Sequence, residues 1–361
     1  MEQPESDEVL IRREGRAGRI TMNRPQALNA LTLPMVGSIW DALVAWKNDP
    51  AVEFILLDGA GERGLCAGGD VRSLYDSRVD GSAFARQFWS DEYRLNALIG
   101  RYPKPYVAIM DGIVMGGGIG LSAHGDHRIV TERSRLAMPE TGIGLIPDVG
   151  GTWLLSHAPD RRGMSRETGT YLALTGQAFN GAEALDLGFA NTLIMSERLP
   201  GALSEMIEDG HPDGAMIRNN STIDEAPRSA LFDLAPAIDA AFSFDRVEDI
   251  VAALDGMPGD WAAKTLAALR SKSPLALKLT LAALRRARDF ASLEEALNME
   301  YRLTVRLYEH GEFLEGIRAL IVDKDKTPRW APPRLEAVTP GMVDSFFAPL
   351  AADAALERDT G

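Results

Sequence analysis

Two carboxylic acids lie in one unusually apolar loop of the sequence, MPETGIGLIPDVGG at residues 138–151. Glu140 and Asp148 are separated there mainly by Gly, Ile, Leu and Pro. An acid among apolar side chains is desolvated, which raises its pKa toward neutral pH and suits it to proton transfer. Two ordinary interpretations stand beside this one: Glu140 as a solvated loop acid, and Asp148 as the N-cap of a helix in GGTWLLSHA.

Two glycine-rich turns precede this loop, and each leads into an expected helix. They are LCAGGD at 65–70 and MGGG at 115–118. Glycine leaves the backbone N–H groups of Gly69 and Gly117 open to a ligand at the positive end of a helix. Two such groups close together would form an oxyanion hole, which stabilises negative charge on a reacting oxygen. Tight helix packing or turn geometry would explain either turn by itself.

Other chemical motifs are absent or incomplete in the sequence. The glycine triplet lacks the spacing of a dinucleotide-binding loop, and GLSAH at 120–124 lacks the last glycine of a nucleophile elbow. His124 and His127 are three residues apart, but no further histidine clusters with them, so we expect no metal site. Cys66 has no local histidine-paired motif, and we interpret it as a small buried apolar residue.

The elements that must position these residues fall into two parts. Up to about residue 200, short apolar runs alternate with helically spaced apolar residues, which predicts an α/β region. We expect strands in 8–22 and 54–61, and a helix that Asp70 caps. Beyond residue 200 the strand pattern fades, and the sequence predicts helices joined by Gly and Pro turns. The predicted domains are therefore residues 1–200 and 201–361.

Charge and composition exclude several classes of protein. Among 361 residues there are 38 Lys and Arg and 52 Asp and Glu, which gives a formal net charge of −14. Such a field repels nucleic acid and anionic membranes, and no run of about 18 apolar residues predicts a membrane span. The single cysteine cannot form an internal disulfide, and the acidic N-terminus lacks the pattern of a signal or transit peptide. We therefore expect a cytoplasmic protein that binds neither nucleic acid nor membrane.

The order of these motifs resembles the crotonase superfamily from about residue 8 to the end of the chain. The resemblance implies a spiral of ββα units followed by an all-helical C-terminal region. It also implies an acyl-CoA thioester substrate, whose carbonyl oxygen lies between the N–H groups of Gly69 and Gly117. CoA would be part of the substrate, so no separate cofactor is expected. The segments that carry the likeness are NRPQALNAL (23–31), LCAGGDV (65–71), DGIVMGGGIGLS (111–122) and MPETGIGLIPDVGGT (138–152). By the same resemblance, the residues that bind CoA are Gln26, Ala27, Leu28, Ala67 and Asp70.

Several features resemble one branch of the superfamily, the 3-hydroxyisobutyryl-CoA hydrolases of valine catabolism. Asp148 occupies a position where hydratases usually have glycine, and Gly120 stands where a hydratase carries its other catalytic Glu. DEYRLN at 91–96 is similar to a hydrolase segment whose Glu, here Glu92, contacts the substrate. The resemblance implies hydrolysis of a short 3-hydroxyacyl-CoA thioester. An enoyl-CoA hydratase or isomerase is the alternative, and a non-catalytic acyl-CoA-binding scaffold is a second.

The resemblance also assigns roles to the acids. Glu140 attacks the thioester carbonyl or activates a water that does, and the sequence leaves both routes open. Asp148 transfers a proton or binds the acyl hydroxyl group, and Glu92 hydrogen-bonds the hydroxyacyl group. Crotonase relatives are often trimers or hexamers, so a homo-oligomer of either size is an open expectation. Arg24, Arg72, Lys272 and Lys278 are candidate cations for the CoA phosphates, and an ordinary solvated surface charge is the alternative interpretation of each.

Overall fold

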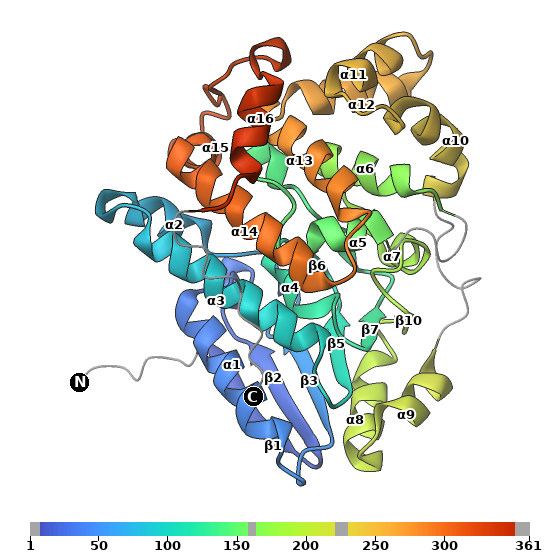
Figure 1. Cartoon of the computed structure of the whole chain (residues 1–361). Coiled ribbons are helices and arrows are strands. Elements are labelled where there is room, and N and C mark those ends of the chain that lie inside the picture. Colours follow the sequence, from blue (N-terminus) through green and yellow to red (C-terminus); the bar gives the residue numbers. More distant parts are fainter. Residues whose placement is uncertain (1–7, 158–163, 221–229, 351–361) are drawn as a thin grey trace. The chain divides into compact units, whose positions relative to one another are not determined.

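The computed structural model describes residues 8–157, 164–220 and 230–350 (Figure 1). Contacts within the chain divide it into two compact units. Unit 1 takes the described parts of Met1–Gly69, Leu95–Leu136 and Phe179–Ser229. Unit 2 takes Asp70–Arg94 and the described parts of Ala137–Ala178 and Ala230–Gly361. Each unit is assembled from separated stretches of chain. The predicted division at residue 200 follows the type of secondary structure, and it stays a prediction.

Unit 1 contains a six-stranded sheet in which β1 and β2 form an antiparallel hairpin and the other pairs run parallel (Figure 1). The hairpin turns at Gly15, whose φ of 57° is a left-handed value that glycine adopts without strain. The strands β3 and β5 are buried along nearly their whole length, as expected for parallel strands covered on both faces. In sheet order the strands are β1 Val9–Glu14, β2 Ala17–Met22, β3 Phe54–Gly59, β5 Tyr106–Met110, β7 His127–Val130 and β10 Thr192–Leu193.

A second sheet, of four short strands, determines where the glycine-rich turns lie. Its order is β4 Gly64–Cys66, β6 Ile113–Met115, β8 Arg135–Ala137 and β9 Phe179–Asn180. The strands β4 and β6 pair in parallel, with Cys66 opposite Val114. The carboxyl ends of parallel neighbours meet at one edge of a sheet, and each of these two strands ends immediately before one of the glycine-rich turns.

The helices of unit 1 surround these sheets. The first long one begins after Thr32, whose hydroxyl accepts the Met35 N–H at 3.3 Å and supplies an N-cap. Apolar residues of α8 (Leu199–Asp209) and α9 (Pro212–Asn219), including Met206 and Met216, pack with Phe54 and Val107 of the larger sheet. The helices are η1 Pro25–Ala27, α1 Leu33–Lys47, α4 Gly117–Ser122, α7 Gly181–Asp186, α8 Leu199–Asp209 and α9 Pro212–Asn219.

Unit 2 is built almost entirely of helices (Figure 1). Its long helix α14 ends at Gly311, which takes a left-handed φ of 94° and so allows the chain to turn into α15. The helix α3, Ala83–Gly100, begins in unit 2 and ends in unit 1. The other helices are α2 Val71–Asp76, η2 Ser77–Asp80, η3 Glu140–Ile143, α5 Gly151–His157, α6 Arg166–Thr175, α10 Ala230–Phe242, α11 Val247–Asp255, α12 Asp260–Arg270, α13 Pro274–Ala287, α14 Leu293–His310, α15 Glu312–Ile317, η6 Arg318–Val322, η7 Leu335–Ala337 and α16 Pro340–Phe347.

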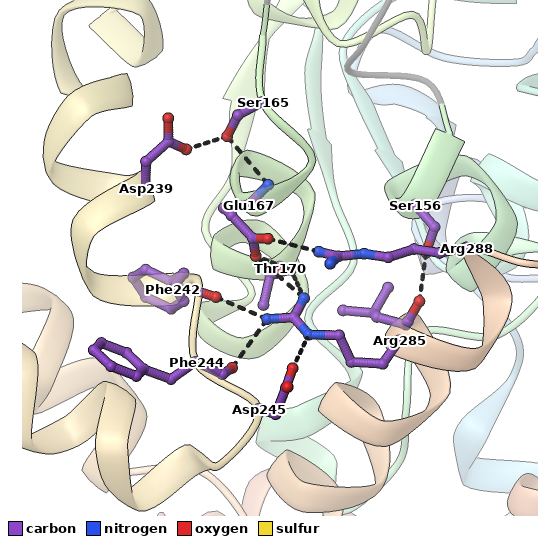
Figure 2. Close-up of polar contacts among 11 residues, drawn as sticks. Ser156, Ser165, Glu167, Thr170, Asp239, Phe242, Phe244, Asp245, Arg285 and Arg288 are labelled. Atoms are coloured by element: carbon purple, nitrogen blue, oxygen red, sulfur yellow. Dashed lines mark hydrogen bonds and ion pairs between the residues drawn. The ribbon is translucent and has the colours of Figure 1, made fainter.

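A polar cluster ties three of these helices together (Figure 2). Glu167 of α6 accepts hydrogen bonds from Arg285 of α13 at 3.1 Å and from Arg288, the C-cap residue of α13, at 2.9 Å. Arg285 also donates to the main-chain oxygens of Phe242 and Phe244, each at 2.9 Å, at the end of α10. These charges are mostly buried, so each depends on its partners. The cluster is a structural feature of unit 2.

The elements expected from the sequence agree with this architecture. Strands occur in 8–22 and 54–61, and the Asp70 side chain accepts the Ser73 N–H at 3.2 Å as the N-cap of α2. The described chain after β10 contains helices and loops, as predicted for residues beyond 200. In the described ranges no helix has both the length and the apolar composition to cross a membrane.

Packing of α5 against α6 can be tested with a glycine pair. Gly169→Ala is expected to destabilise the protein by about 3 kcal/mol, because the new methyl group overlaps the main-chain oxygen of Leu155. Gly201→Ala in α8 is the matched control, because among the described residues nothing lies within 4 Å of the added carbon. Alanine is favoured over glycine in a helix by up to about 1 kcal/mol. Denaturant unfolding measures the free energy of unfolding of both variants. Equal values for Gly169→Ala and Gly201→Ala would contradict this packing of α5 against α6.

Candidate active site

The two glycine-rich turns meet in unit 1. A Cβ atom at Gly68 would lie 3.6 Å from Met115 O and 3.9 Å from Gly117 N, so the two turns are in close contact. Gly68 has a φ of 112° and Gly116 a φ of 46°, which are conformations that favour glycine. Among the described residues, neither the Gly69 N–H nor the Gly117 N–H donates to a main-chain oxygen in the hydrogen bonds of the turns, loops and helix caps. The structure thus brings the two expected oxyanion-hole turns together.

The loop expected to bind CoA lies against the first of these turns. Ala67 N–H donates to Leu28 O at 3.0 Å, and Leu31 N–H donates to Gly68 O at 2.9 Å. Leu28 and Asn29 both have left-handed φ values, 53° and 55°. The Asn29 amide stabilises this conformation by donating to Ala60 O and Gly64 O, each at 3.1 Å. Ala67 therefore contacts Leu28, which follows Gln26 and Ala27 of η1 in unit 1, while Asp70 caps α2 in unit 2.

Unit 2 holds the acids. Glu92, Glu140 and Asp148 are 2%, 5% and 5% exposed, so the interpretation of Glu140 as a solvated loop acid is wrong. The Tyr93 hydroxyl, which is itself buried, donates to Asp148 Oδ2 at 2.7 Å. Among the described residues, Glu92 Oε1 and Glu140 Oε2 have no hydrogen-bond partner. A buried polar atom without a partner costs free energy, and such atoms mark places where a ligand can bind.

Burial changes how these acids titrate. Desolvation raises the pKa of Glu92 and of Glu140 well above the usual range, and the negative charge of Asp148 raises both further. The pKa of Asp148 is raised by desolvation to about 6, although the hydrogen bond from Tyr93 opposes the shift. Desolvation and the charges of Asp148 and Glu300 keep the pKa of Tyr93 well above its usual value, so Tyr93 remains a donor. Asp148 can therefore hold and release a proton near neutral pH.

Two residues of this cluster escaped the sequence analysis, Tyr93 and Glu300. Glu300 is fully buried on α14 and accepts hydrogen bonds from Gly150 N–H at 2.7 Å and Thr152 N–H at 2.9 Å. It therefore accepts the N–H groups at the start of α5. The Asp148 carboxylate instead bonds to Tyr93, so the interpretation of Asp148 as the N-cap of α5 is not supported. A sequence signal existed, since Glu300 stands at an apolar spacing with Leu297 and Leu303.

The candidate phosphate-binding cations differ in their surroundings. Three of the four already form ion pairs with acids. Lys272 lies beside the Glu140 turn, because its Nζ atom is 3.3 Å from the position of a Cβ at Gly142. Its pKa is lowered by desolvation, while the charge of Glu140 opposes this shift. The ion pairs are Arg24 with Glu8 at 2.9 Å, Arg72 with Asp76 at 2.7 Å and Lys278 with Glu248 at 2.6 Å.

The structure also shows the surroundings of His127 and Cys66. Within the described ranges no three His, Cys, Asp or Glu side chains are grouped so that they could hold a metal ion. His127 lies 3.5 Å from Asp213, which is an ion-pair geometry. Cys66 is buried, as expected for a small apolar residue. The polar groups described above are carboxylates and a phenol in unit 2 and backbone N–H groups in unit 1.

Comparison with known proteins identifies the family. A family model described as enoyl-CoA hydratase/isomerase matches residues 17–347. The chain belongs to the enoyl-CoA hydratase/isomerase family. This confirms the predicted crotonase-superfamily membership and its fold class, α/β with a spiral of ββα units and a helical C-terminal region.

Relatives and solved structures in this family cover nearly the whole chain. A Gallus gallus protein named 3-hydroxyisobutyryl-CoA hydrolase, mitochondrial, is 41% identical over 352 residues, which are 95% of this chain and 89% of that protein. The Homo sapiens protein of the same name is 37% identical over 352 residues, 96% of this chain and 89% of that protein. The structure of a carnitinyl-CoA dehydratase from Mycobacterium thermoresistibile is 45% identical, with a TM-score of 0.92 over 99% of this chain and 100% of that one. An enoyl-CoA hydratase from Rhodobacter sphaeroides 2.4.1 is 44% identical, with a TM-score of 0.88 over 95% and 98%.

One expectation is overturned by these relatives of the family. The hydrolases from Gallus gallus, Danio rerio and Homo sapiens are all named as mitochondrial, so the cytoplasmic expectation is wrong. That expectation came from charge, a single cysteine and the composition of the N-terminus. Charge and cysteine content report a reducing environment and an acidic surface, which are not properties of one compartment.

The hydrogen bond from Tyr93 to Asp148 can be tested by titration. Tyr93→Phe is expected to raise the pKa of Asp148 above about 6, because burial favours the neutral acid and the opposing hydrogen bond is lost. Carboxyl ¹³C NMR, with Asp148 assigned through Asp148→Asn, measures this pKa. Tyr308→Phe is the control, since that hydroxyl donates to Leu74 O at 3.1 Å. If the Asp148 pKa is the same in Tyr93→Phe as in Tyr308→Phe, the hydrogen bond from Tyr93 to Asp148 does not form in solution.

Stability should fall as these acids ionise. The folded-state pKa values of Asp148 and Glu300 rise from 3.8 and 4.5 to about 6 and about 7. The stabilisation of the protonated forms is complete below the ordinary pKa values and is lost as pH rises through the raised ones. Glu140 is shifted in the same direction. Glu140→Gln is therefore expected to melt above wild type at pH 8, with the difference shrinking toward pH 5.

The matched control for this pH effect is Glu309→Gln. At Glu309, desolvation alone would raise the pKa, but hydrogen bonds from Ser82 and Arg86 outweigh it and lower the pKa. Glu309→Gln should therefore melt at or below the wild-type temperature at pH 8. Thermal unfolding of the three proteins at both pH values tests the argument. A Glu140→Gln variant that melts below wild type at pH 8 would refute it.

Proposed function

We propose that this protein hydrolyses a short 3-hydroxyacyl-CoA thioester, with 3-hydroxyisobutyryl-CoA as the substrate and 3-hydroxyisobutyrate and CoA as products. The observation that carries the proposal is the buried Asp148, with its raised pKa, in a loop that also holds Glu140. Support comes from eight relatives, 37–41% identical, that are named 3-hydroxyisobutyryl-CoA hydrolase. The same proposal places the reaction in valine catabolism.

Thioester hydrolysis requires stabilisation of a negative oxygen. In the proposed mechanism the Gly69 and Gly117 N–H groups donate to the thioester carbonyl oxygen as it gains charge. Removal of one such donor typically costs about 3–4 kcal/mol in the transition state. The glycine-rich turns suit this role because no side chain hinders access to the backbone.

The carboxylates would supply the nucleophile and move the protons. In one route Glu140 takes a proton from a water whose oxygen attacks the carbonyl carbon. The C–S bond then breaks, and the CoA thiolate receives a proton. In the other route a Glu140 oxygen attacks the carbonyl carbon and expels CoA, and water then hydrolyses the mixed anhydride. Asp148 transfers the proton in either route or binds the acyl hydroxyl.

The hydroxyl group of the substrate would bind at the buried acids. Glu92 Oε1 and Glu140 Oε2 lack partners among the described residues, and each is an acceptor when ionised. A 3-hydroxyl group can donate one hydrogen bond and accept another. Binding it at Glu92 would satisfy a buried polar atom that otherwise destabilises the protein. This favours a hydroxyacyl chain over a plain acyl chain.

Hydration or isomerisation of an enoyl-CoA is the second candidate. It is favoured by the two solved structures at 44–45% identity, whose names are a carnitinyl-CoA dehydratase and an enoyl-CoA hydratase. Against it stands Gly120, which is buried in α4 where, by resemblance, a hydratase carries its other Glu. A non-catalytic scaffold is less consistent with acids held at raised pKa values, because such acids reduce stability.

Partners of the proposed enzyme follow from its substrate. CoA would enter as part of the thioester, so we expect no separate cofactor. The trimer or hexamer expected by resemblance to crotonases remains a prediction, which sedimentation of the purified protein can test. Arg24, Arg72, Lys272 and Lys278 remain candidates for contacting the CoA phosphates.

Paired assays distinguish these functions. We expect free thiol to be released from 3-hydroxyisobutyryl-CoA, with no loss of enone absorbance from crotonyl-CoA. Glu140→Gln and Asp148→Asn should each lower thiol release by roughly a hundredfold or more, in line with loss of a general acid or base. Asp344→Asn is the control, because this exposed acid pairs only loosely with Arg286, at 3.4 Å. Enone loss without thiol release would replace the hydrolase by a hydratase, and binding without either reaction would favour the scaffold.

A further inference from the structure

Glu300 forms a set of contacts in unit 2 that the proposed reaction does not yet use. Its side chain is fully buried. Oε2 accepts the Gly150 N–H at 2.7 Å, and Oε1 accepts both the Thr152 N–H at 2.9 Å and the Thr152 hydroxyl. All three donors lie within four residues of Asp148 in the sequence. One carboxylate from a distant helix, α14, therefore holds the backbone that follows Asp148.

This backbone has a conformation that needs such support. Val149, directly after Asp148, has a φ of 53°, which is left-handed. A β-branched residue in this region is strained by about 1–3 kcal/mol, and such residues persist only where their surroundings hold them. The turn is closed locally by Gly151 N–H, which donates to Asp148 O at 2.6 Å. Glu300 adds bonds to the two residues on either side of Gly151.

We propose that Glu300 is a positioning residue for Asp148, because it holds the backbone of the Asp148 loop and places a second negative charge beside it. The inference rests on the proposed role of Asp148 in the reaction. Glu300 bonds to the loop, so it acts through Asp148. Tyr93 holds the Asp148 side chain, while Glu300 holds the main chain that follows Asp148.

The charge of Glu300 acts on several neighbours as well. Desolvation raises the pKa of Glu300 to about 7, the bonds from Thr152 and Gly150 oppose this, and the Asp148 charge raises it further. Repulsion between two carboxylates is mutual, so the pair titrates together. Other groups that face the charges of Asp148 and Glu300 are Tyr93 and Glu92 on α3 and Glu140 on η3. Lys272 interacts in turn with Glu140.

Steady-state kinetics on the substrate that wild type hydrolyses give the first test. In Glu300→Gln one carboxylate oxygen becomes an amide N–H₂, which cannot accept a hydrogen bond, so one backbone bond is lost with little change in shape. We expect kcat to fall at least about tenfold, while KM changes less than about threefold. The reason is that losing this bond displaces the Asp148 loop more than it displaces the groups that contact the substrate. Thr152→Val removes only the hydroxyl bond and should lower kcat by less. If Glu300→Gln does not fold, Thr152→Val still tests the claim.

Glu167→Gln is the matched control in unit 2. Glu167 is also mostly buried. Among the described residues, its carboxylate accepts hydrogen bonds from Thr170, Arg285 and Arg288, none of which belongs to the Asp148 loop (Figure 2). Its loss should reduce thermal stability and leave kcat within about twofold of wild type at a temperature where the protein is folded. A kcat for Glu300→Gln equal to that of Glu167→Gln would overturn the proposal.

A titration tests the same inference without any activity. Carboxyl ¹³C NMR of the free protein should show the Glu300 titration moving to lower pH in Asp148→Asn, because the like charge of Asp148, which raises the pKa of Glu300, is gone. Glu167→Gln should leave the Glu300 titration unchanged. An unmoved or raised Glu300 titration in Asp148→Asn overturns the inference. If wild type does not hydrolyse the thioester while the titration moves as expected, the proposed function fails and the coupling of Glu300 to Asp148 stands.

Discussion

The burial of carboxylic acids in unit 2 is the constraint on which the candidate site depends. Glu92, Glu140, Asp148 and Glu300 are all nearly or fully removed from solvent. An ionised acid in such surroundings is disfavoured, so its pKa rises and its ionisation reduces the stability of the fold. The same desolvation makes an acid able to exchange protons near neutral pH. Reactivity and instability therefore have one physical origin in this protein.

The acids differ in how much support they receive, and this divides them into roles. Glu300 accepts three hydrogen bonds, and Asp148 accepts one from Tyr93. Glu92 and Glu140 each keep an oxygen without a partner among the described residues. A fully bonded buried acid is suited to hold structure in place, whereas an acid with an unused oxygen is suited to meet a ligand. This ordering agrees with the proposed substrate contact at Glu92 and Glu140 and with the proposed positioning role of Glu300.

Unit 1 supplies a different kind of chemistry by a different means. Its small sheet places β4 and β6 in parallel, so the turns that follow them lie at the same edge. Glycines with left-handed φ values at Gly68 and Gly116 then turn the backbone where another residue would be strained. The N–H groups concerned belong to the main chain. Their placement therefore depends on strand pairing, and hardly on side-chain identity.

Much of this could be predicted from the sequence, because the relevant signals are local. The apolar loop around Glu140 and Asp148 predicts desolvation, and the glycine-rich turns predict exposed N–H groups. Asp70 as an N-cap, the hairpin in 8–22 and the helical region beyond 200 follow from short-range patterns. The motif order also predicted the family.

Only the tertiary structure decided which residues meet across long distances in the sequence. Glu300 bonds to Gly150 and Thr152, and Tyr93 bonds to Asp148, and no local pattern encodes either contact. A capping signal at Asp148 looked credible because an acid precedes a helix. A buried acid on another helix took those N–H groups instead. The sequence by itself thus determined which chemical groups are present and that they are desolvated. The fold decided which group holds which, because hydrogen bonds depend on distance and direction in space.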